Sequence, residues 1–355
     1  MTSPQPSASR RRIISILWFP VFFAIVLPLA FLAAYHQPQP HDVPIGVVGD
    51  ASQVSRITGE LDRVSAGGFE VRQLSSVPAA AAAVRGQQLD AAYAGDGSAS
   101  TLYVARGASG TRASYLQGVF AGIAAEAGHT PPQTVDLVPL AAGDSGTGIF
   151  FFVFPLMMSG LIAAMALQQL PTWGIGRRAV TVAAVGAIGA VATYLTAVGL
   201  NVLPDKPLLP VYAFLLTQVF GQMMVGAAPL LKQYFLGFAL TFALILNVPS
   251  SGGTVSPDVL PAPFRYLSDA MPLAQAVKIT RNVSYFHNAD ITRPTLLLLL
   301  WAAVAAGAVA TAWLRQSRSR LPRTQAGLAL RTVPSSSAVP SSSTVPSSST
   351  LPSNG

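Results

Sequence analysis

The chain has 355 residues, of which 51% are hydrophobic and only 10% are charged, whereas soluble domains carry about 25% charged residues. This composition excludes an ordinary soluble protein and indicates an integral membrane protein. The net charge of +8 would favour nucleic acid as a partner of a soluble protein, but in a membrane protein it follows topology, and we expect no nucleic-acid partner. The chain has no cysteine, which excludes disulfides and thiolate metal sites.

The N-terminal region is basic and then apolar. Arg10, Arg11 and Arg12 precede an apolar run from Ile13 to Ala34. Such a pattern is typical of a cleaved signal peptide or of a retained transmembrane helix. The apolar core of a signal peptide has about 7–15 residues, and this run is longer. We therefore expect a cytoplasmic segment at 1–12 and a first transmembrane helix at 13–34.

Residues 35–146 have the pattern of a globular domain. Short apolar runs at Val43–Gly49 and Phe69–Leu74 flank Ser52–Ser65, where apolar residues recur every three or four positions, so strand, helix and strand are expected. Further helices are expected at Pro78–Val84 and at Arg112–Ala127, the latter with Tyr115, Val119 and Ile123 on one face. Further strands are expected at Leu89–Ala94, Thr101–Ala105 and Thr134–Val138. The sequence predicts a small extracytoplasmic α/β domain whose strand order is open.

Residues 147–248 consist of apolar runs separated by short polar breaks. A helix needs about 20 apolar residues to cross the hydrocarbon core of a bilayer, and the breaks divide this block into four runs. We predict the second to fifth transmembrane helices at Gly148–Leu167, Ala179–Leu200, Leu208–Leu230 and Tyr234–Val248.

The remaining third of the chain contains one more apolar run. Residues 249–293 are rich in proline but also apolar, and we expect an outer loop with interfacial helices at Ala262–Leu267 and Leu273–Ile279. A sixth transmembrane helix is expected at 294–314. Residues 315–355 are basic and then repeat the pattern VPSSST, which cannot bury a core, so a disordered cytoplasmic tail is expected. The predicted fold is thus a six-helix integral membrane protein with an α/β domain between its first and second helices.

The distribution of charge gives this arrangement a direction. With a cytoplasmic N-terminus, the inner segments contain eleven Lys and Arg residues and no Asp or Glu, and all 14 acidic residues lie outside. This is the bias of the positive-inside rule. We expect both termini to be cytoplasmic in a bacterial plasma membrane.

The sequence contains no motif for energy supply or hydrolysis. The phosphate-loop pattern GxxxxGK[ST] and the patterns HExxH and GxSxG are absent. We therefore expect no enzyme activity, cofactor or metal in this chain. His36, His41 and Asp42 are candidate metal ligands, but a solvated linker explains them better. No Asp or Glu lies in an expected crossing, which argues against proton-driven transport, including a resistance-nodulation-division pump.

The polar residues of the expected crossings are uncharged. Thr217, Gln218 and Gln222 lie in the fourth crossing, with Gln218 and Gln222 on one helix face, and Asn247 ends the fifth. They are candidates for a substrate path or for a helix interface. The interface is favoured, because polar side chains commonly bond across packed helices in membranes.

One span, a globular domain and five further spans form an order that resembles permease subunits of ABC transporters of the type-2 exporter class. The chain is most similar to the phage-infection-protein (Pip/YhgE-like) branch, at Pro44–Asp50 (PIGVVGD), Gln87–Ala94 (QQLDAAYA) and Leu260–Arg281. In that family the inner loop after the second span docks on a separate ATPase. The resemblance therefore implies an ATPase-coupling loop at Gln168–Arg178, with Trp173, Arg177 and Arg178 as its candidate contacts.

The resemblance implies a homodimeric permease in contact with membrane lipid. Such a permease would work with a separate ATPase subunit and export a lipid-like, peptide or hydrophobic substrate. The alternative is a scaffold or receptor that transports nothing and whose ectodomain binds a cell-envelope or protein partner. The presence or absence of an ATPase partner discriminates between the two.

Overall fold

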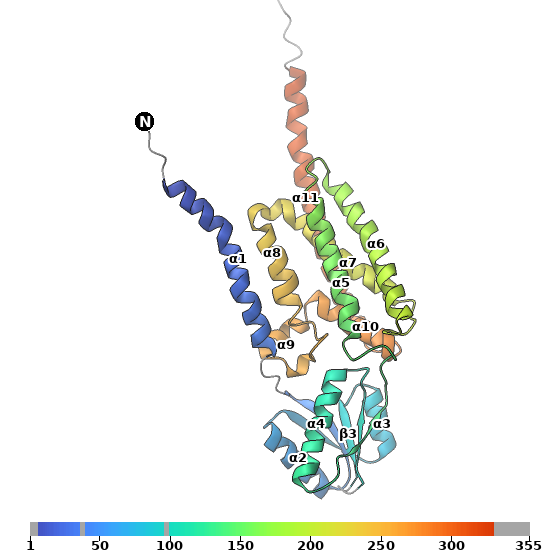
Figure 1. Cartoon of the computed structure of the whole chain (residues 1–355). Coiled ribbons are helices and arrows are strands. Elements are labelled where there is room, and N and C mark those ends of the chain that lie inside the picture. The colour runs from blue at the N-terminus through green and yellow to red at the C-terminus, as the bar shows by residue number, and fades with distance from the viewer. Residues whose placement is uncertain (1–5, 36–39, 96–98, 330–355) are drawn as a thin grey trace, which may run out of the picture. The chain divides into compact units, whose positions relative to one another are not determined.

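The computed structural model describes residues 6–35, 40–95 and 99–329 (Figure 1). The proline and serine repeat of the expected tail and the candidate ligand His36 lie outside these residues. The chain divides into two compact units, residues 1–313 and 314–355. In the second unit the described residues continue helix α11 (Thr292–Ala329).

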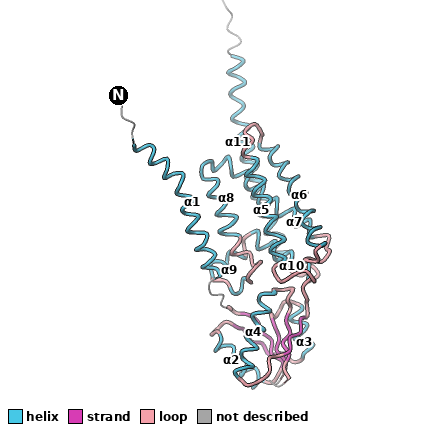
Figure 2. The backbone as a smooth tube through the Cα atoms, in the orientation of Figure 1, coloured by secondary structure: helices cyan, strands magenta, loops and turns pink. Residues whose placement is uncertain are grey.

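Five strands form one mixed sheet in the order β2-β1-β3-β4-β5. The strands lie together, in magenta, in Figure 2. Strand β1 pairs in parallel with β2 and β3, β4 is antiparallel to β3, and β5 is parallel to β4. The strands are β1 (Val43–Val48), β2 (Phe69–Leu74), β3 (Ala91–Ala94), β4 (Thr101–Val104) and β5 (Gln133–Asp136). All five lie at or next to the positions expected from the apolar pattern.

Three helices pack on the sheet. Helices α2 (Ala51–Val64) and α4 (Gly110–Glu126) cover one face, and α3 (Val77–Arg85) covers the other. Each helix begins with a side-chain cap, from Asp50, Ser76 and Ser109 respectively, which satisfies a backbone N–H of its first turn. These strands and helices together are called the sheet region below.

Helix α4 contacts the sheet through Ala113, Leu116 and Phe120, and Val119 and Ile123 of the expected stripe pack against the same core. Tyr115, the third residue of that stripe, is 36% exposed. Phe120 stacks on Tyr93 of β3 with 5.3 Å between ring centroids. Helical spacing predicts which residues share a side of the helix, but it does not show how far the sheet covers each of them.

Four helical segments are long and apolar enough to cross a membrane, as expected of a multi-pass membrane protein. They are α5 (Gly148–Leu167), α6 (Ile175–Gly199), the segment Leu209–Asn247, and the part Thr292–Arg318 of α11. The protein is therefore mostly helical, with four candidate membrane-spanning helices and one sheet.

The segment Leu209–Asn247 is not one regular helix. Helix α7 (Leu209–Leu231) ends at a 3-10 turn, η1 (Lys232–Tyr234), where Lys232 has a φ of 49°. The short helix α8 (Phe235–Leu240) and a π-helix, η2 (Thr241–Asn247), follow. In α1 (Pro6–Tyr35) the apolar stretch found among the described side chains is Pro20–Ala34. The first expected crossing is not among the four candidate helices, and the fifth is only the last part of the third of them. These two crossings therefore remain predictions.

Helices α5, α6 and α7 pack closely through small residues. A Cβ atom on Gly160 of α5 would lie 2.5 Å from the Thr217 carbonyl oxygen of α7, and one on Gly186 of α6 would lie 2.4 Å from Thr217 Oγ1. Such contacts are typical of membrane helices, whose backbones approach closely at glycine.

The connection between η2 and α11 is largely helical. It contains η3 (Pro257–Val259), α9 (Ala262–Ser268) and α10 (Pro272–Tyr285). Helix α10 is longer than the interfacial helix expected at Leu273–Ile279. It is mostly buried and packs against α5 and α7, so protein rather than lipid shields most of it.

Candidate functional site

A cavity of about 890 Å³ lies between the sheet region and the connection that contains η3, α9 and α10. Its wall includes residues of α4, of this connection and of the first turns of α11. Five of the lining residues are cationic: Arg112, Arg265, Lys278, Arg281 and Arg293. Three are carboxylates: Asp258, Asp269 and Asp290. The lining thus carries a formal net charge of +2.

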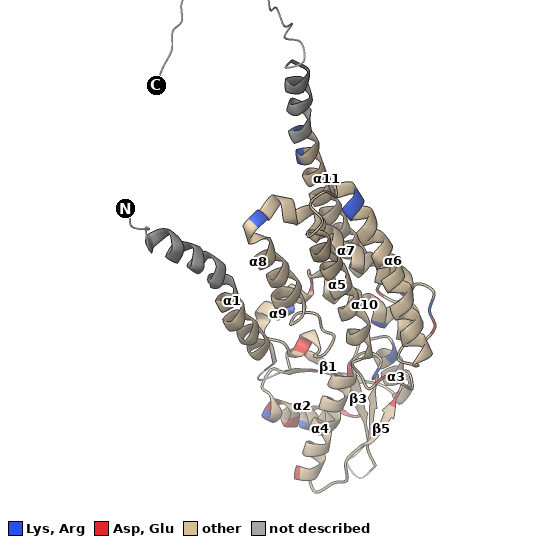
Figure 3. Ribbon diagram, turned by 45° about the horizontal axis from the view of Figure 1, so that its top comes forward, with Lys and Arg blue, Asp and Glu red and all other residues tan. Residues whose placement is uncertain are grey.

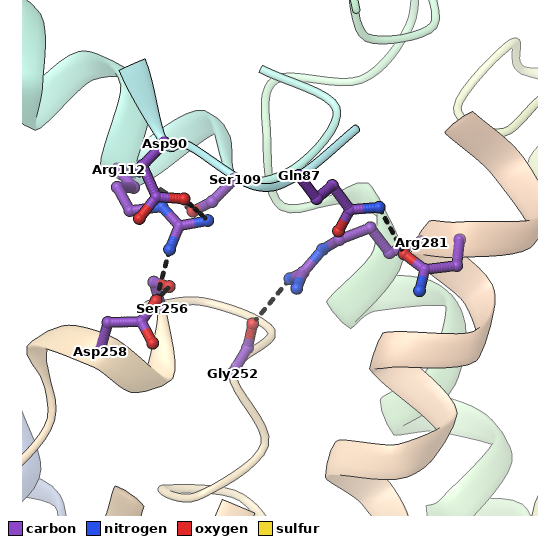
Figure 4. A network of polar contacts seen from close by, with 9 residues as sticks. Gln87, Asp90, Ser109, Arg112, Gly252, Ser256, Asp258 and Arg281 are labelled. Atoms are coloured by element: carbon purple, nitrogen blue, oxygen red, sulfur yellow. Dashed lines mark hydrogen bonds and ion pairs between the residues drawn. The ribbon is translucent and has the colours of Figure 1, made fainter. Parts of the chain in front are cut away.

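Arg112 joins the sheet region to η3 at one side of this cavity (Figure 4). Its Nη2 atom lies 2.9 Å from Asp90 Oδ1, and its Nη1 atom donates to the carboxylate of Asp258. The side chains of Arg112 and Asp90 are only 13% and 11% exposed. Ser256 Oγ donates to Asp258 Oδ2 over 2.9 Å and orients that carboxylate. Since both acids contact one guanidinium, their positions are coupled.

Local structure explains how Arg112 reaches this position. Ser109 caps α4, and its hydroxyl accepts from the backbone N–H of Arg112 over 3.2 Å. Arg112 therefore lies in the first turn of α4, and Asp90 immediately precedes β3. His41 N–H also donates to the Asp258 carbonyl oxygen over 3.2 Å, so the segment that leads into β1 is bonded to η3 as well.

Burial changes the protonation of Asp90. Desolvation raises the pKa of its carboxyl from 3.8 to about 6, the nearby Asp258 adds to the rise, and Arg112 opposes it. At neutral pH this carboxyl is mostly ionised and pairs with Arg112. It takes up a proton in a mildly acidic medium.

Arg281 of α10 points to the same cavity but has no ion pair among the described residues. Its Nη2 atom donates to the Gly252 carbonyl oxygen over 3.1 Å (Figure 4). Burial lowers the pKa of Arg281 to about 10, and the like charge of Arg112 contributes. The guanidinium is therefore charged at neutral pH. Next to it, Gln87 Nε2 donates to Asn282 Oδ1 over 3.2 Å, a second bond from the sheet region to α10.

Asp144 connects the beginning of α5 to the end of α10. Its Oδ1 atom accepts from the backbone N–H groups of Gly146 and Gly148, over 2.7 and 2.8 Å. Its Oδ2 atom accepts from the Tyr285 hydroxyl over 3.4 Å. Burial raises the pKa of Tyr285 to about 12, so the hydroxyl keeps its proton and remains a donor at neutral pH.

The three candidate residues of the coupling loop between α5 and α6 have two different roles. Arg178 is buried, and its guanidinium donates to Gln168 Oε1 over 2.6 Å and to the Leu170 carbonyl oxygen over 2.8 Å. Arg177 is exposed and lies 3.8 Å above the Trp173 ring, a cation–π contact. Arg178 therefore shapes the loop, and Trp173 with Arg177 forms its accessible surface.

The polar residues of α7 bond to one another and to α6. Gln218 Nε2 donates to Thr217 Oγ1 over 3.2 Å, and Gln222 Nε2 donates to Gln218 Oε1 and to the Ala179 carbonyl oxygen, each over 2.9 Å. These three side chains are absent from the described lining of the 890 Å³ cavity. Their bonds favour the helix-interface interpretation over a substrate path.

Asn247 lies at the junction of η2 and α10. It is fully buried, its Nδ2 atom donates to the Phe242 carbonyl oxygen over 2.8 Å, and its Oδ1 atom accepts from Leu273 N–H over 3.1 Å. Asn247 therefore caps the start of α10 and joins it to the apolar segment before it. Asn247 therefore has a helix-interface role, and the helix that it bonds to, α10, contributes residues to the wall of the cavity.

Sequence reasoning did not select Asp90, Arg112, Asp258 or Arg281 as a site. Asp90 and Arg281 lie in two of the segments that carry the family resemblance, Gln87–Ala94 and Leu260–Arg281. The available signal was one charged residue beside apolar residues in the first segment and four charged residues, Arg265, Asp269, Lys278 and Arg281, in the second. That signal marks a residue but does not identify its partner.

No cluster of three or more His, Asp or Glu side chains suited to a metal ion occurs among the described residues. The chain matches no family model, and its comparison with curated proteins and with solved structures also finds no match. The family resemblance therefore stays an expectation, and function has to be inferred from the geometry of the side chains.

Proposed function

We propose that this chain is the membrane-spanning subunit of an exporter that is driven by a separate ATPase and moves a lipid-like, peptide or hydrophobic substrate outward. In this proposal α1, α5, α6, α7, α8 with η2, and α11 are six crossings of a bacterial plasma membrane. The sheet region is an extracytoplasmic α/β domain, both termini are cytoplasmic, and the subunit is a homodimer.

The observation that carries the proposal is the chain of bonds from the candidate spans to the sheet region. Asn247 bonds the end of the Leu209–Asn247 segment to α10, and Asp144 bonds the start of α5 to Tyr285 of α10. Arg112 and Gln87 then bond the sheet region to η3 and to α10. A shift of α5 or α7 would displace α10 and with it the sheet region. An exporter needs such coupling between its spans and its outer domain, and a static scaffold does not.

The charges at the ends of α5, α6 and α7 that lie away from the sheet region support a cytoplasmic coupling loop. Gly143 N–H donates to the Asn201 carbonyl oxygen over 2.9 Å, so the α6–α7 connection lies beside the start of α5. The α5–α6 loop, which contains Arg177, and the turn η1, which contains Lys232, therefore both lie at the ends of α5, α6 and α7 that are away from the sheet region. Figure 3 shows this loop and this turn on the same side of the helices. No acidic residue occurs in either loop. This bias favours the cytoplasmic side, where an ATPase would dock.

The test is recovery of the ATPase with the full chain from membranes in a mild detergent. We expect a partner that hydrolyses ATP and carries a phosphate-loop motif. Replacing Trp173 and Arg177 by alanine should abolish its recovery without lowering the amount of the chain. Arg63→Ala is the matched control, because Arg63 is an arginine on α2 whose side chain is 74% exposed.

Two results would contradict the proposal. Recovery of the same ATPase by the double variant would remove the coupling role of the loop. Purification of the unaltered chain without any ATP-hydrolysing partner, together with a stable cell-envelope partner, would favour the scaffold or receptor alternative.

A further inference from the structure

The cations of the 890 Å³ cavity outnumber the groups that neutralise them. Arg112 pairs with Asp90 and Asp258, and Lys278 Nζ lies 3.1 Å from Asp269 Oδ1. The remaining cations, Arg265, Arg281 and Arg293, have no ion pair among the described residues. Asp290 is the one lining carboxylate left, and it pairs with none of them in the described part of the chain.

Arg281 has no ion-pair partner among the described residues, although Asp258 and Asp90 partly offset the effect of its burial on the pKa. A partly buried charge without a direct counter-ion is costly, because the protein solvates it less well than water does. Its single bond to the Gly252 carbonyl oxygen leaves the other guanidinium nitrogens without an acceptor among the residues that the structure describes. None of them belongs to the fully buried, unbonded atoms of the described residues, so they remain accessible from the cavity. A bound anion would supply the missing acceptors.

The volume and the lining of the cavity indicate which kind of anion fits it. About 890 Å³ lies within the range of small-molecule sites, about 300–1,000 Å³, and is much larger than an inorganic ion needs. Leu296 of α11 lines the cavity and is 62% exposed, and Leu299 and Leu300 continue an exposed apolar surface on that helix. A ligand with one anionic group and an organic remainder fits this combination.

We propose that the cavity binds the phosphate group of a phosphate ester, with Arg265, Arg281 and Arg293 as its contacts. Arginine suits this task, since its planar guanidinium presents paired N–H donors to phosphate oxygens and stays charged. A phosphate monoester is preferred to a carboxylate or a phosphodiester, because it has three terminal oxygens and a charge of about −1.5 to −2 at neutral pH, whereas the other two groups have two free oxygens and one charge. The ester has two sources, a phospholipid headgroup or a soluble metabolite. Binding is a property of this chain alone and requires neither an ATPase nor transport.

The test is a binding measurement by calorimetry on the full-length chain purified in a neutral detergent. The probes are dihexanoyl-phosphatidic acid, glycerol 3-phosphate and, as the ligand without phosphate, dihexanoylglycerol. Binding of the lipid alone identifies a headgroup site, and binding of both phosphate esters identifies a site for soluble esters as well. Either result supports the proposal. Equal binding of dihexanoylglycerol, or binding of none of the probes, would overturn it.

Variants then assign the contacts. Arg281→Gln should weaken binding of the phosphate probe by about tenfold or more, the effect expected when a charged hydrogen bond is lost. Should this variant fail to fold, the double variant Arg265→Gln with Arg293→Gln decides, because Arg293 is exposed and Arg265 is only partly buried. It should weaken binding to a similar extent. The matched control is Arg63→Gln on α2, which should bind like the unaltered chain. Unchanged affinity of the double variant would refute the assignment. A chain that binds phosphate but has no ATPase partner would refute the proposed function and leave this inference intact.

Discussion

Replacing Asp90 by asparagine should remove a pH-dependent cost from the folded protein. The pKa of Asp90 is raised from 3.8 to about 6 on folding, chiefly by burial. Between these two values the folded chain binds a proton that the unfolded chain releases. The folded state is therefore stabilised below about pH 4, and this stabilisation is lost as the pH rises through 6. At 1.36 kcal/mol for each pKa unit, the loss is about 3 kcal/mol. Asparagine has the shape of aspartate but does not ionise.

The measurement is the difference in Tm between the Asp90→Asn variant and the unaltered chain, in detergent, at several pH values from 4 to 7. Whatever its sign at pH 4, this difference should rise in favour of the variant by several degrees toward pH 7, because the variant escapes the cost of ionisation. The matched control is Asp62→Asn, which removes one exposed carboxylate from α2. A difference that stays constant, or that falls as the pH rises, would refute the assignment of a raised pKa to Asp90.

Two further predictions concern helix packing. Gly226→Ala should lower the free energy of unfolding by roughly 1–3 kcal/mol, because its Cβ would lie 2.5 Å from the backbone carbonyl carbon of Ala308. In the matched control, Gly307→Ala, the added Cβ meets no atom within 4 Å. This control should raise the free energy of unfolding by up to about 1 kcal/mol. Thermal unfolding should give Tm shifts of opposite sign, and equal shifts would contradict the close α7–α11 contact. Asn247→Ala should destabilise the chain by about 1–3 kcal/mol, since it leaves a buried N–H at the start of α10 without its acceptor. The same assay checks this, and an unchanged Tm would contradict the capping role.

The strands and helices of the sheet region could be predicted because their signals are local. Strand β2 has the bounds that its apolar pattern predicted, Phe69–Leu74. The exposure of Tyr115 on α4 could not be predicted in this way, because Tyr115 has the same helical spacing as Val119 and Ile123, which do pack against the sheet. The most buried residues of α4 are set by long-range packing, such as the stacking of Phe120 on Tyr93 of β3.

The candidate site depends even more on long-range contacts. Arg112 and Asp258 are 146 positions apart, and Gln87 and Asn282 are 195 apart. A single sequence shows that each residue is polar, but it contains no information about which charge meets which. The glutamines of α7 were easier to interpret, because a polar side chain inside an apolar helix has few partners except a neighbouring helix. The bond of Gln222 to α6 agrees with that expectation.

The apolar segment Leu209–Asn247 is too long for a single crossing, and its helix breaks at Lys232. As one straight helix its 39 residues would extend about 58 Å, almost twice the hydrocarbon thickness of about 30 Å. The segment divides at Lys232, which has a positive φ. The first part is α7, whose 23 residues suffice for a crossing. The second part, called the second arm, consists of six residues in α8 and seven in η2. That arm extends only about 20 Å, so its end needs protein rather than lipid around its polar backbone groups. Asn247 meets this need, because its bonds to Phe242 and Leu273 place the end of the arm against α10 and so beside the wall of the cavity.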